Sequence, residues 1–108
     1  MSEQYKVAYS SAALQDLKDI YAYIAFELLA PDAAKAQLDR IRAKIRALEQ
    51  LPLRHAAVDW EPWQGMGMRQ VPIDRFIAFY TVQAGNVTII RIVYGGRDLS
   101  RLAKEPLP

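Results

Sequence analysis

Four arginines lie in the most apolar third of the chain, and they are the first candidates for a catalytic or binding site. They stand beside apolar runs or, in one case, inside a run: Arg69, Arg75, Arg91 and Arg97. Guanidinium groups bind phosphates and carboxylates through paired hydrogen bonds, so this set suits phosphodiester cleavage or the docking of a partner. A charge inside an apolar strand is costly without a partner. Arg91 is therefore expected either to reach a carboxylate such as Asp98 or Asp74 or, as we favour, to face a sheet surface on which a partner lands.

Two residues of the segment 52–66 could assist RNA cleavage. Attack by a 2′-hydroxyl needs a base, an acid for the leaving oxygen, and cations around the phosphorane. Glu61 or His55 could act as the base, with Arg75 and Arg97 as the cations. A solvated loop glutamate and an exposed histidine without an orienting partner are the simpler interpretations of these two side chains.

Trp60 and Trp63 lie in the same segment, one on each side of Glu61 and Pro62. Aromatic side chains dominate the energetics of many interfaces, so the pair could form a docking surface. They could equally roof the core beneath the loop. The sequence leaves both interpretations open.

The arginines are positioned by a predicted β-hairpin. Two apolar runs, Phe76 to Val82 and Val87 to Tyr94, are separated by four residues that include the turn formers Gly85 and Asn86. Both faces of each run are apolar, which is typical of central strands. A preceding strand, 68–73, contains Pro72 near its end, which indicates an edge position or a bulge. Gly95 and Gly96 end the last strand, and a short terminal helix containing Leu99, Leu102 and Ala103 is expected after them.

The N-terminal half predicts a short strand and two helices. Residues 5–10 alternate as a strand does, Ser10 and Ser11 offer an N-cap, and residues 12–29 carry apolar side chains at spacings of three and four. Pro31 suits the first turn of a second helix, expected to end at Leu51. So short a connection predicts an antiparallel helical hairpin. The order of elements, with two helices followed by a run of strands, indicates one α+β domain, 1–108, in which an antiparallel sheet packs on the helical hairpin.

Composition narrows the class of protein. The 108 residues include no cysteine and one histidine, so we expect no disulfide, metal site or cofactor. No apolar stretch of membrane-spanning length and no export signal is visible, and a cytoplasmic protein without membrane contact is expected. A formal charge of +2 permits direct nucleic-acid binding without requiring it.

Several segments together resemble the RelE/ParE superfamily of type II toxins. They are VAYSSAALQDLKDIYAYIA, the start of the next helix near APDAA, and the ending FIAFYTV and VTIIRIVYGGRDL. The resemblance implies a compact sheet packed on a helical hairpin and a cognate antitoxin that wraps the toxin and silences it. It also implies one of two targets, because RelE-like members cut mRNA on the ribosome whereas ParE-like members poison DNA gyrase.

The residues favour the ParE branch. The RelE pattern has an arginine where Ile77 stands and a tyrosine near Ala103, and only Arg97 matches it. Glu61 before Pro62 is similar to the glutamate that acts as a base in the related YoeB branch. We therefore expect a toxin of the plasmid-stabilisation type that inhibits gyrase through a binding surface drawn from Arg97, Arg91, Arg69, Arg75, Trp60 and Trp63. The alternatives are a ribosome-dependent mRNA endoribonuclease using Arg97, Arg75, Glu61 and His55, or a non-toxic relic that only binds its partner.

Overall fold

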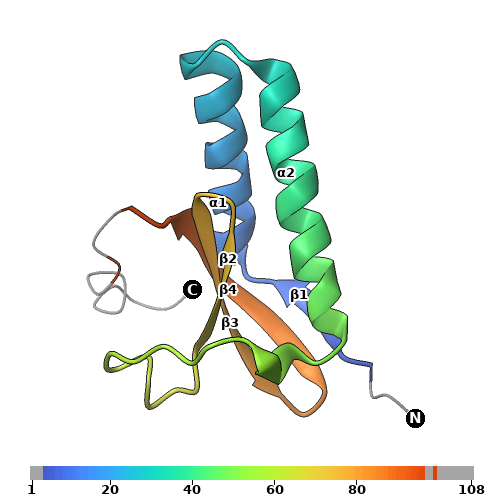
Figure 1. Cartoon of the computed structure of the whole chain (residues 1–108), viewed down its shortest axis with the longest axis vertical. Helices are drawn as coiled ribbons and strands as arrows, with labels where there is room; N and C mark the ends of the chain where they lie inside the picture. Colours follow the sequence, from blue (N-terminus) through green and yellow to red (C-terminus); the bar gives the residue numbers. More distant parts are fainter. Residues whose placement is uncertain (1–3, 97–98, 100–108) are drawn as a thin grey trace.

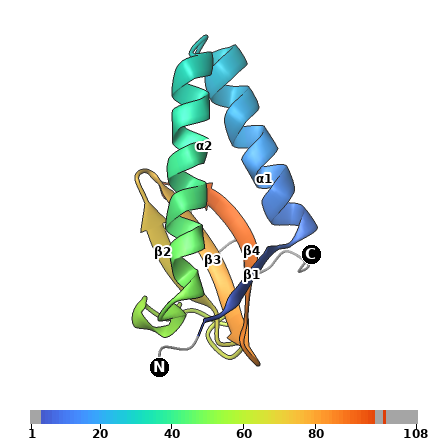
Figure 2. The same ribbon diagram turned by 90° about the vertical axis from the view of Figure 1, so that its right-hand side faces the viewer.

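The fold is a four-stranded sheet with a long helical hairpin across one of its faces. The computed structural model describes residues 4–96 and Leu99. Two helices, α1 (Ser11–Ala22) and α2 (Pro31–Arg46), stand side by side on the sheet and project well beyond it (Figures 1 and 2). The hairpin is thus half packed on the sheet and half free of it. No helix in the described part of the chain is long and apolar enough to cross a membrane.

The strands lie in the order β1-β4-β3-β2, so the two predicted central strands are indeed central. Their bounds are Lys6–Tyr9 for β1, Arg69–Ile73 for β2, Phe76–Gln83 for β3 and Asn86–Tyr94 for β4. The α+β class, the element order and the edge position of the strand containing Pro72 are confirmed.

One detail of the predicted sheet is wrong, because β1 pairs with β4 in parallel and the sheet is mixed. The helical hairpin leaves the sheet where β1 ends and returns the chain to the end where β1 begins, where the amide of Tyr5 donates to the carbonyl of Glu49 at 2.8 Å. β2 therefore runs in the same direction as β1, β3 runs back, and β4 again runs with β1. The pairing of β1 with β4 is parallel because the hairpin ends beside the start of β1.

The β3–β4 hairpin is closed by a two-residue turn. Ala84 and Gly85 both have positive φ, 49° and 82°, as the tightest hairpin turns require. A bulge between Phe79 and Tyr80 then shifts the register, so that Phe79 faces Arg91 and Tyr80 faces Ile89. The extra residue on β4 reorients the strand beyond it. This bulge sets the direction of Arg91.

The first helix begins as predicted and ends differently. Ser10 caps α1, because its hydroxyl accepts from the amide of Ala13 at 3.0 Å and donates to the carbonyl of Ile90 at 2.8 Å. After Ala22 the chain widens into a π-helical segment, η1 (Tyr23–Glu27). The second helix begins at Pro31, and its predicted last turn is a separate 3₁₀ turn, η2 (Ala47–Glu49). The expected hairpin is confirmed.

The sheet has a core on each face. The larger core lies under the helices and includes Leu17, Ile41, Ile45, Tyr80 and Ile92. A smaller one lies on the other face beneath the loop 56–68, and we call it the outer core: Val58, Trp63, Met68, Phe79 and Val93. Trp63 is 1% exposed, and Trp60 packs against the same cluster. The two tryptophans therefore roof the outer core.

Arg69 and Tyr80 fix the start of that loop. The Arg69 guanidinium donates to the carbonyls of Leu53 and His55 at 3.1 and 2.8 Å. The buried Tyr80 hydroxyl donates to the carbonyl of Pro52, and burial raises the pKa of Tyr80 to about 12. Both side chains attach the short 3₁₀ turn η3 (Pro52–Arg54) to the sheet. Arg69 thus already has structural partners.

Candidate protein-docking groove

The projecting half of the helical hairpin leaves large apolar side chains uncovered. Tyr23 is 58% exposed, Leu28 55% and, across from them on β4, Tyr94 53%. They line a cavity of about 670 Å³ between the hairpin and the end of the sheet, together with Ile24 and Phe76. We call these five residues the hairpin groove. Exposed apolar clusters of this kind mark binding surfaces for other proteins.

The hairpin groove continues along the free edge of β4. A second cavity of about 290 Å³ shares Tyr23, Ile24, Phe76 and Tyr94 with the first and adds Asp16 and Arg91. β1 is short and covers β4 only as far as Ile89, so among residues 4–96 and Leu99 the rest of β4 has no neighbouring strand on this side. The groove is therefore bounded by a helix and by an uncovered strand edge.

Asp16 occupies part of that edge. Its carboxylate accepts from Nε and Nη2 of Arg91 at 2.9 and 3.1 Å and from the backbone amide of Ile92 at 2.8 Å. The two side chains are mostly buried, with 13% and 21% of their surface exposed. Asp16 thus neutralises Arg91 and takes the place that a strand partner would have.

This pair corrects the favoured interpretation of Arg91. Its guanidinium is bound to a carboxylate, and that carboxylate is neither of the two expected candidates. Asp74 pairs instead with Arg40 at 2.8 Å, and Asp98 lies outside the described residues. The bulge that precedes Arg91 and the short β1 together bring it to α1, and the bulge was not anticipated.

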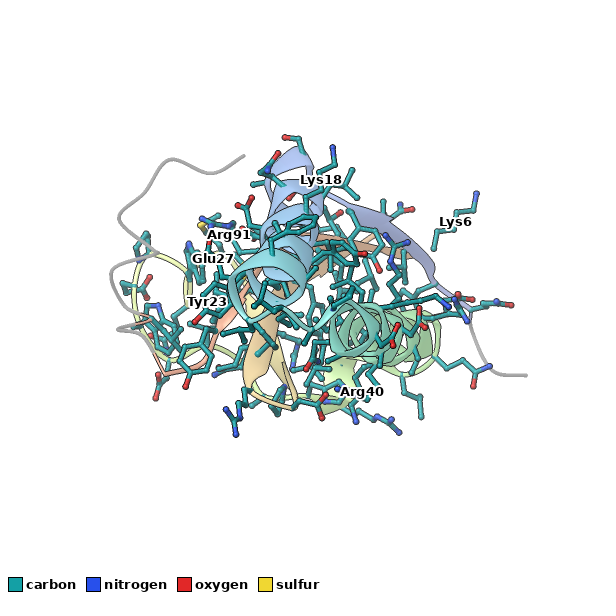
Figure 3. All side chains as sticks on the ribbon, turned by 90° about the horizontal axis from the view of Figure 1, so that it is seen from above. Lys6, Lys18, Tyr23, Glu27, Arg40 and Arg91 are labelled. Atoms are coloured by element: carbon teal, nitrogen blue, oxygen red, sulfur yellow. The ribbon has the colours of Figure 1, made fainter. Side chains whose placement is uncertain are left out.

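The other end of the groove has a polar rim. Asp74 accepts from Arg40 Nε and Gln37 Nε2, and these hydrogen bonds hold the pKa of the Asp74 carboxyl below its ordinary value. Arg75 lines the cavity and is exposed. Figure 3, a view down the hairpin, shows Tyr23 and Arg40 on this side of the two helices. A partner here would meet an apolar floor with cations at one end.

The remaining predicted site residues lie apart from one another. His55 is bound through its carbonyl to Arg69 at the start of β2, whereas Arg75 follows the end of β2. Five strand residues put roughly 13 Å between the two ends. Glu61 lies in the loop over the outer core, where it accepts from the amide of Gly65 at 3.0 Å. Burial and the nearby Arg54 and Lys44 lower the pKa of His55.

The C-terminal predictions fall mostly on undescribed residues. Arg97, Asp98, Leu102 and Ala103 lie outside the described part of the chain, and Leu99 packs against the outer core. Of the three arginines of that set that the structure describes, Arg75 and Arg91 line the groove's cavities and Arg69 does not. Within residues 4–96 and Leu99, no group of histidine, cysteine, aspartate or glutamate side chains could hold a metal ion.

The groove residues were missed although the sequence contains a signal for them. Between Ile20 and Ala30 every residue except Glu27 is apolar or aromatic. A helix needs an apolar stripe on only one side to pack on a sheet, so apolar residues all around it indicate a second covered face. Asp16 gave no comparable signal, since its partner lies 75 residues away.

Comparison with known proteins agrees with this architecture. Residues 7–99 match the model of the family described as ParE toxin of type II toxin-antitoxin system, parDE. No curated protein sequence matches the chain significantly. Among solved structures, the chain is similar to one from the chromosomal ParDE system of P. aeruginosa, with 23% identity, a TM-score of 0.71, and coverage of 84% of this chain and 96% of that one.

A second structural match comes from the RelBE2 toxin-antitoxin complex of Mycobacterium tuberculosis. Its identity is 18%, its TM-score 0.62, and the alignment covers 84% of this chain and 98% of that one. The two structural matches support the fold, and the family model covers most of the sequence. The chain therefore belongs to the ParE toxin family of type II toxin-antitoxin systems.

Proposed function

We propose that this toxin is silenced by an antitoxin segment seated in the hairpin groove, and that the free toxin acts by binding DNA gyrase. The observation that carries the proposal is the exposed apolar surface of Tyr23, Leu28 and Tyr94 around one cavity. Such a surface is costly to leave in water, and a permanent partner would cover it.

An amphipathic helix is the occupant that the groove suits best. Helix-in-groove recognition uses a few apolar anchors on one helix face. Covering one large apolar side chain contributes about 1.5–3 kcal/mol. Tyr23, Leu28 and Tyr94 are each only a little more than half exposed, so they contribute part of the binding free energy and further contacts of the partner must offset the cost of association. The exposed Arg75 at the rim favours a carboxylate at that end of the occupant, whereas Arg40 is already paired with Asp74.

The placement of the candidate cleavage residues supports binding as the toxic mechanism. His55, Glu61 and Arg75 lie at the start of β2, over the outer core and past the end of β2, so they do not face a common point. Cleavage requires base and cations around one phosphate. Ile77, at the position where RelE-like toxins have an arginine, packs against the outer core.

Two assays on purified toxin test the target. We expect inhibition of gyrase supercoiling and no cleavage of ribosome-bound mRNA, because the toxin exposes apolar binding surfaces and its candidate cleavage residues lie apart. The Glu61→Gln variant serves as a control, since it should inhibit supercoiling as strongly as the wild type. Cleaved mRNA with unaffected supercoiling would contradict the proposal, and a strong loss of that cleavage in Glu61→Gln would establish the nuclease alternative. Absence of growth arrest on induction without antitoxin would indicate the non-toxic relic.

A further inference from the structure

The other side of the helical hairpin has a second groove of different chemistry. Leu14, Tyr21, Phe26 and Leu38 line a cavity of about 420 Å³ between α1 and α2, with Lys18 and Arg42 beside them. We call these six residues the back groove. Leu14 is 46% exposed and Phe26 68%. Figure 3 shows Lys18 on the opposite side of α1 from Tyr23 and Glu27, so the two grooves face different directions.

The back groove is extended by the outer side of β1. A smaller cavity of about 220 Å³ shares Arg42 with it and adds Tyr9 and Arg46. Burial raises the pKa of the Tyr9 hydroxyl, and the neighbouring Arg42 and Arg46 partly oppose that rise. The two guanidinium groups therefore lie close to Tyr9 at the junction of the two cavities.

The rim of the back groove is basic and is not neutralised by the described residues. The charged residues lining its two cavities are Lys18, Arg42, Arg46 and Glu49. Within residues 4–96 and Leu99, the ion pairs join Arg40 to Asp74 and Arg91 to Asp16, so both belong to the hairpin groove. The carboxylate of Glu49 accepts from the side-chain amide of Gln4 at 3.0 Å. The back groove thus offers cations for carboxylates that a partner would bring.

We propose that the back groove binds an acidic amphipathic helix of the protein that the toxin acts on, an inference that rests on the proposed function. Arg42 and Arg46 are one helical turn apart, about 6 Å along the axis, which matches carboxylates four residues apart on a facing helix. The exposed Leu14 and Phe26 receive the apolar side of that helix. The two grooves lie on different sides of the hairpin, so a change in the back groove leaves the antitoxin segment's seat intact, and silencing then comes from the rest of the bound antitoxin blocking the approach of the target.

The charge-reversal variant Arg42→Glu tests this inference. Arg42 is exposed and shared by both cavities, so the substitution changes the rim without disturbing the core. We expect the toxin concentration that half-inhibits gyrase supercoiling to rise at least tenfold, with antitoxin affinity changed less than twofold. Lys44→Glu is the matched control, because it makes the same charge change on an exposed residue of α2 that lines neither cavity. It should inhibit as the wild type does. Phe26→Ala should weaken inhibition through the apolar floor.

Four results would overturn the inference. These are full inhibition by Arg42→Glu, an equal loss in Lys44→Glu, a parallel loss of antitoxin binding, or binding of free duplex DNA by the wild type that Arg42→Glu abolishes. If the wild type arrests growth while supercoiling is untouched, the gyrase part of the proposed function fails alone. Induced growth arrest then decides the inference: relief by Arg42→Glu but not by Lys44→Glu supports it, and unchanged arrest contradicts it.

Discussion

The Leu28→Glu variant is expected to escape its antitoxin, with affinity lowered at least 100-fold. Leu28 lines the apolar floor of the hairpin groove and is more than half exposed in the free toxin. A carboxylate there stays hydrated in the free protein and loses its water when a partner helix covers it. A 100-fold loss corresponds to about 2.7 kcal/mol, which is within the range of single interface anchors. Titration calorimetry with the antitoxin measures the change, and co-expressed antitoxin should no longer restore growth.

Leu29→Glu is the matched control for this prediction. Leu29 is the next residue, is 83% exposed and does not line the cavity. The same substitution there should leave antitoxin affinity within a fewfold of the wild type. Equal losses from the two variants would mean that the whole hairpin tip, and not the groove, contacts the antitoxin. Unchanged binding by Leu28→Glu would exclude the hairpin groove as its site.

The Asp16→Asn variant is expected to destabilise the toxin by about 2–3 kcal/mol. Asp16 accepts three hydrogen bonds through two charged oxygens, and two of them come from Arg91. Asparagine keeps one acceptor oxygen and presents an amide donor where the other oxygen was. It also removes the negative charge beside a mostly buried guanidinium. Urea unfolding followed by circular dichroism measures the difference in the free energy of unfolding.

Asp19→Asn controls for the loss of a helix carboxylate. Asp19 is exposed on the same helix and accepts from the side-chain amide of Gln15 at 2.9 Å. Its substitution should change stability by less than 0.5 kcal/mol, as is usual at exposed positions. If Asp16→Asn is no less stable than Asp19→Asn, the ion pair with Arg91 does not stabilise the fold.

The sequence predicted the order of elements because each element depends on local signals. Ser10 before α1, Pro31 at the first turn of α2, the Gly85 turn and Pro72 on an edge strand act within a few residues of where they stand. The parallel pairing of β1 with β4 was missed, because it follows from the end of the sheet to which the helical hairpin returns the chain and not from the strands themselves.

The candidate site was harder to predict because its residues are joined across the chain. Asp16 and Arg91 meet because the short β1 stops before Arg91 and β4 has a bulge, and the bulge is not visible in residue types. Arg69 was an attractive binding candidate by its type, yet it donates to two loop carbonyls. Trp60 and Trp63 could not be placed on a surface or in a core until the outer core was seen.

Hydrogen–deuterium exchange of the toxin with and without its antitoxin shows whether the hairpin groove is the antitoxin-binding site. An antitoxin helix in the hairpin groove should slow amide exchange in residues 23–28 and in residues 91–94 at the end of β4. Both segments line the cavities that the helix would cover. Exchange in β1 and in the part of α2 beside Arg42 and Arg46 should be unchanged. Slower exchange confined to β1 and to that part of α2, with η1 and the end of β4 unaffected, would contradict the account.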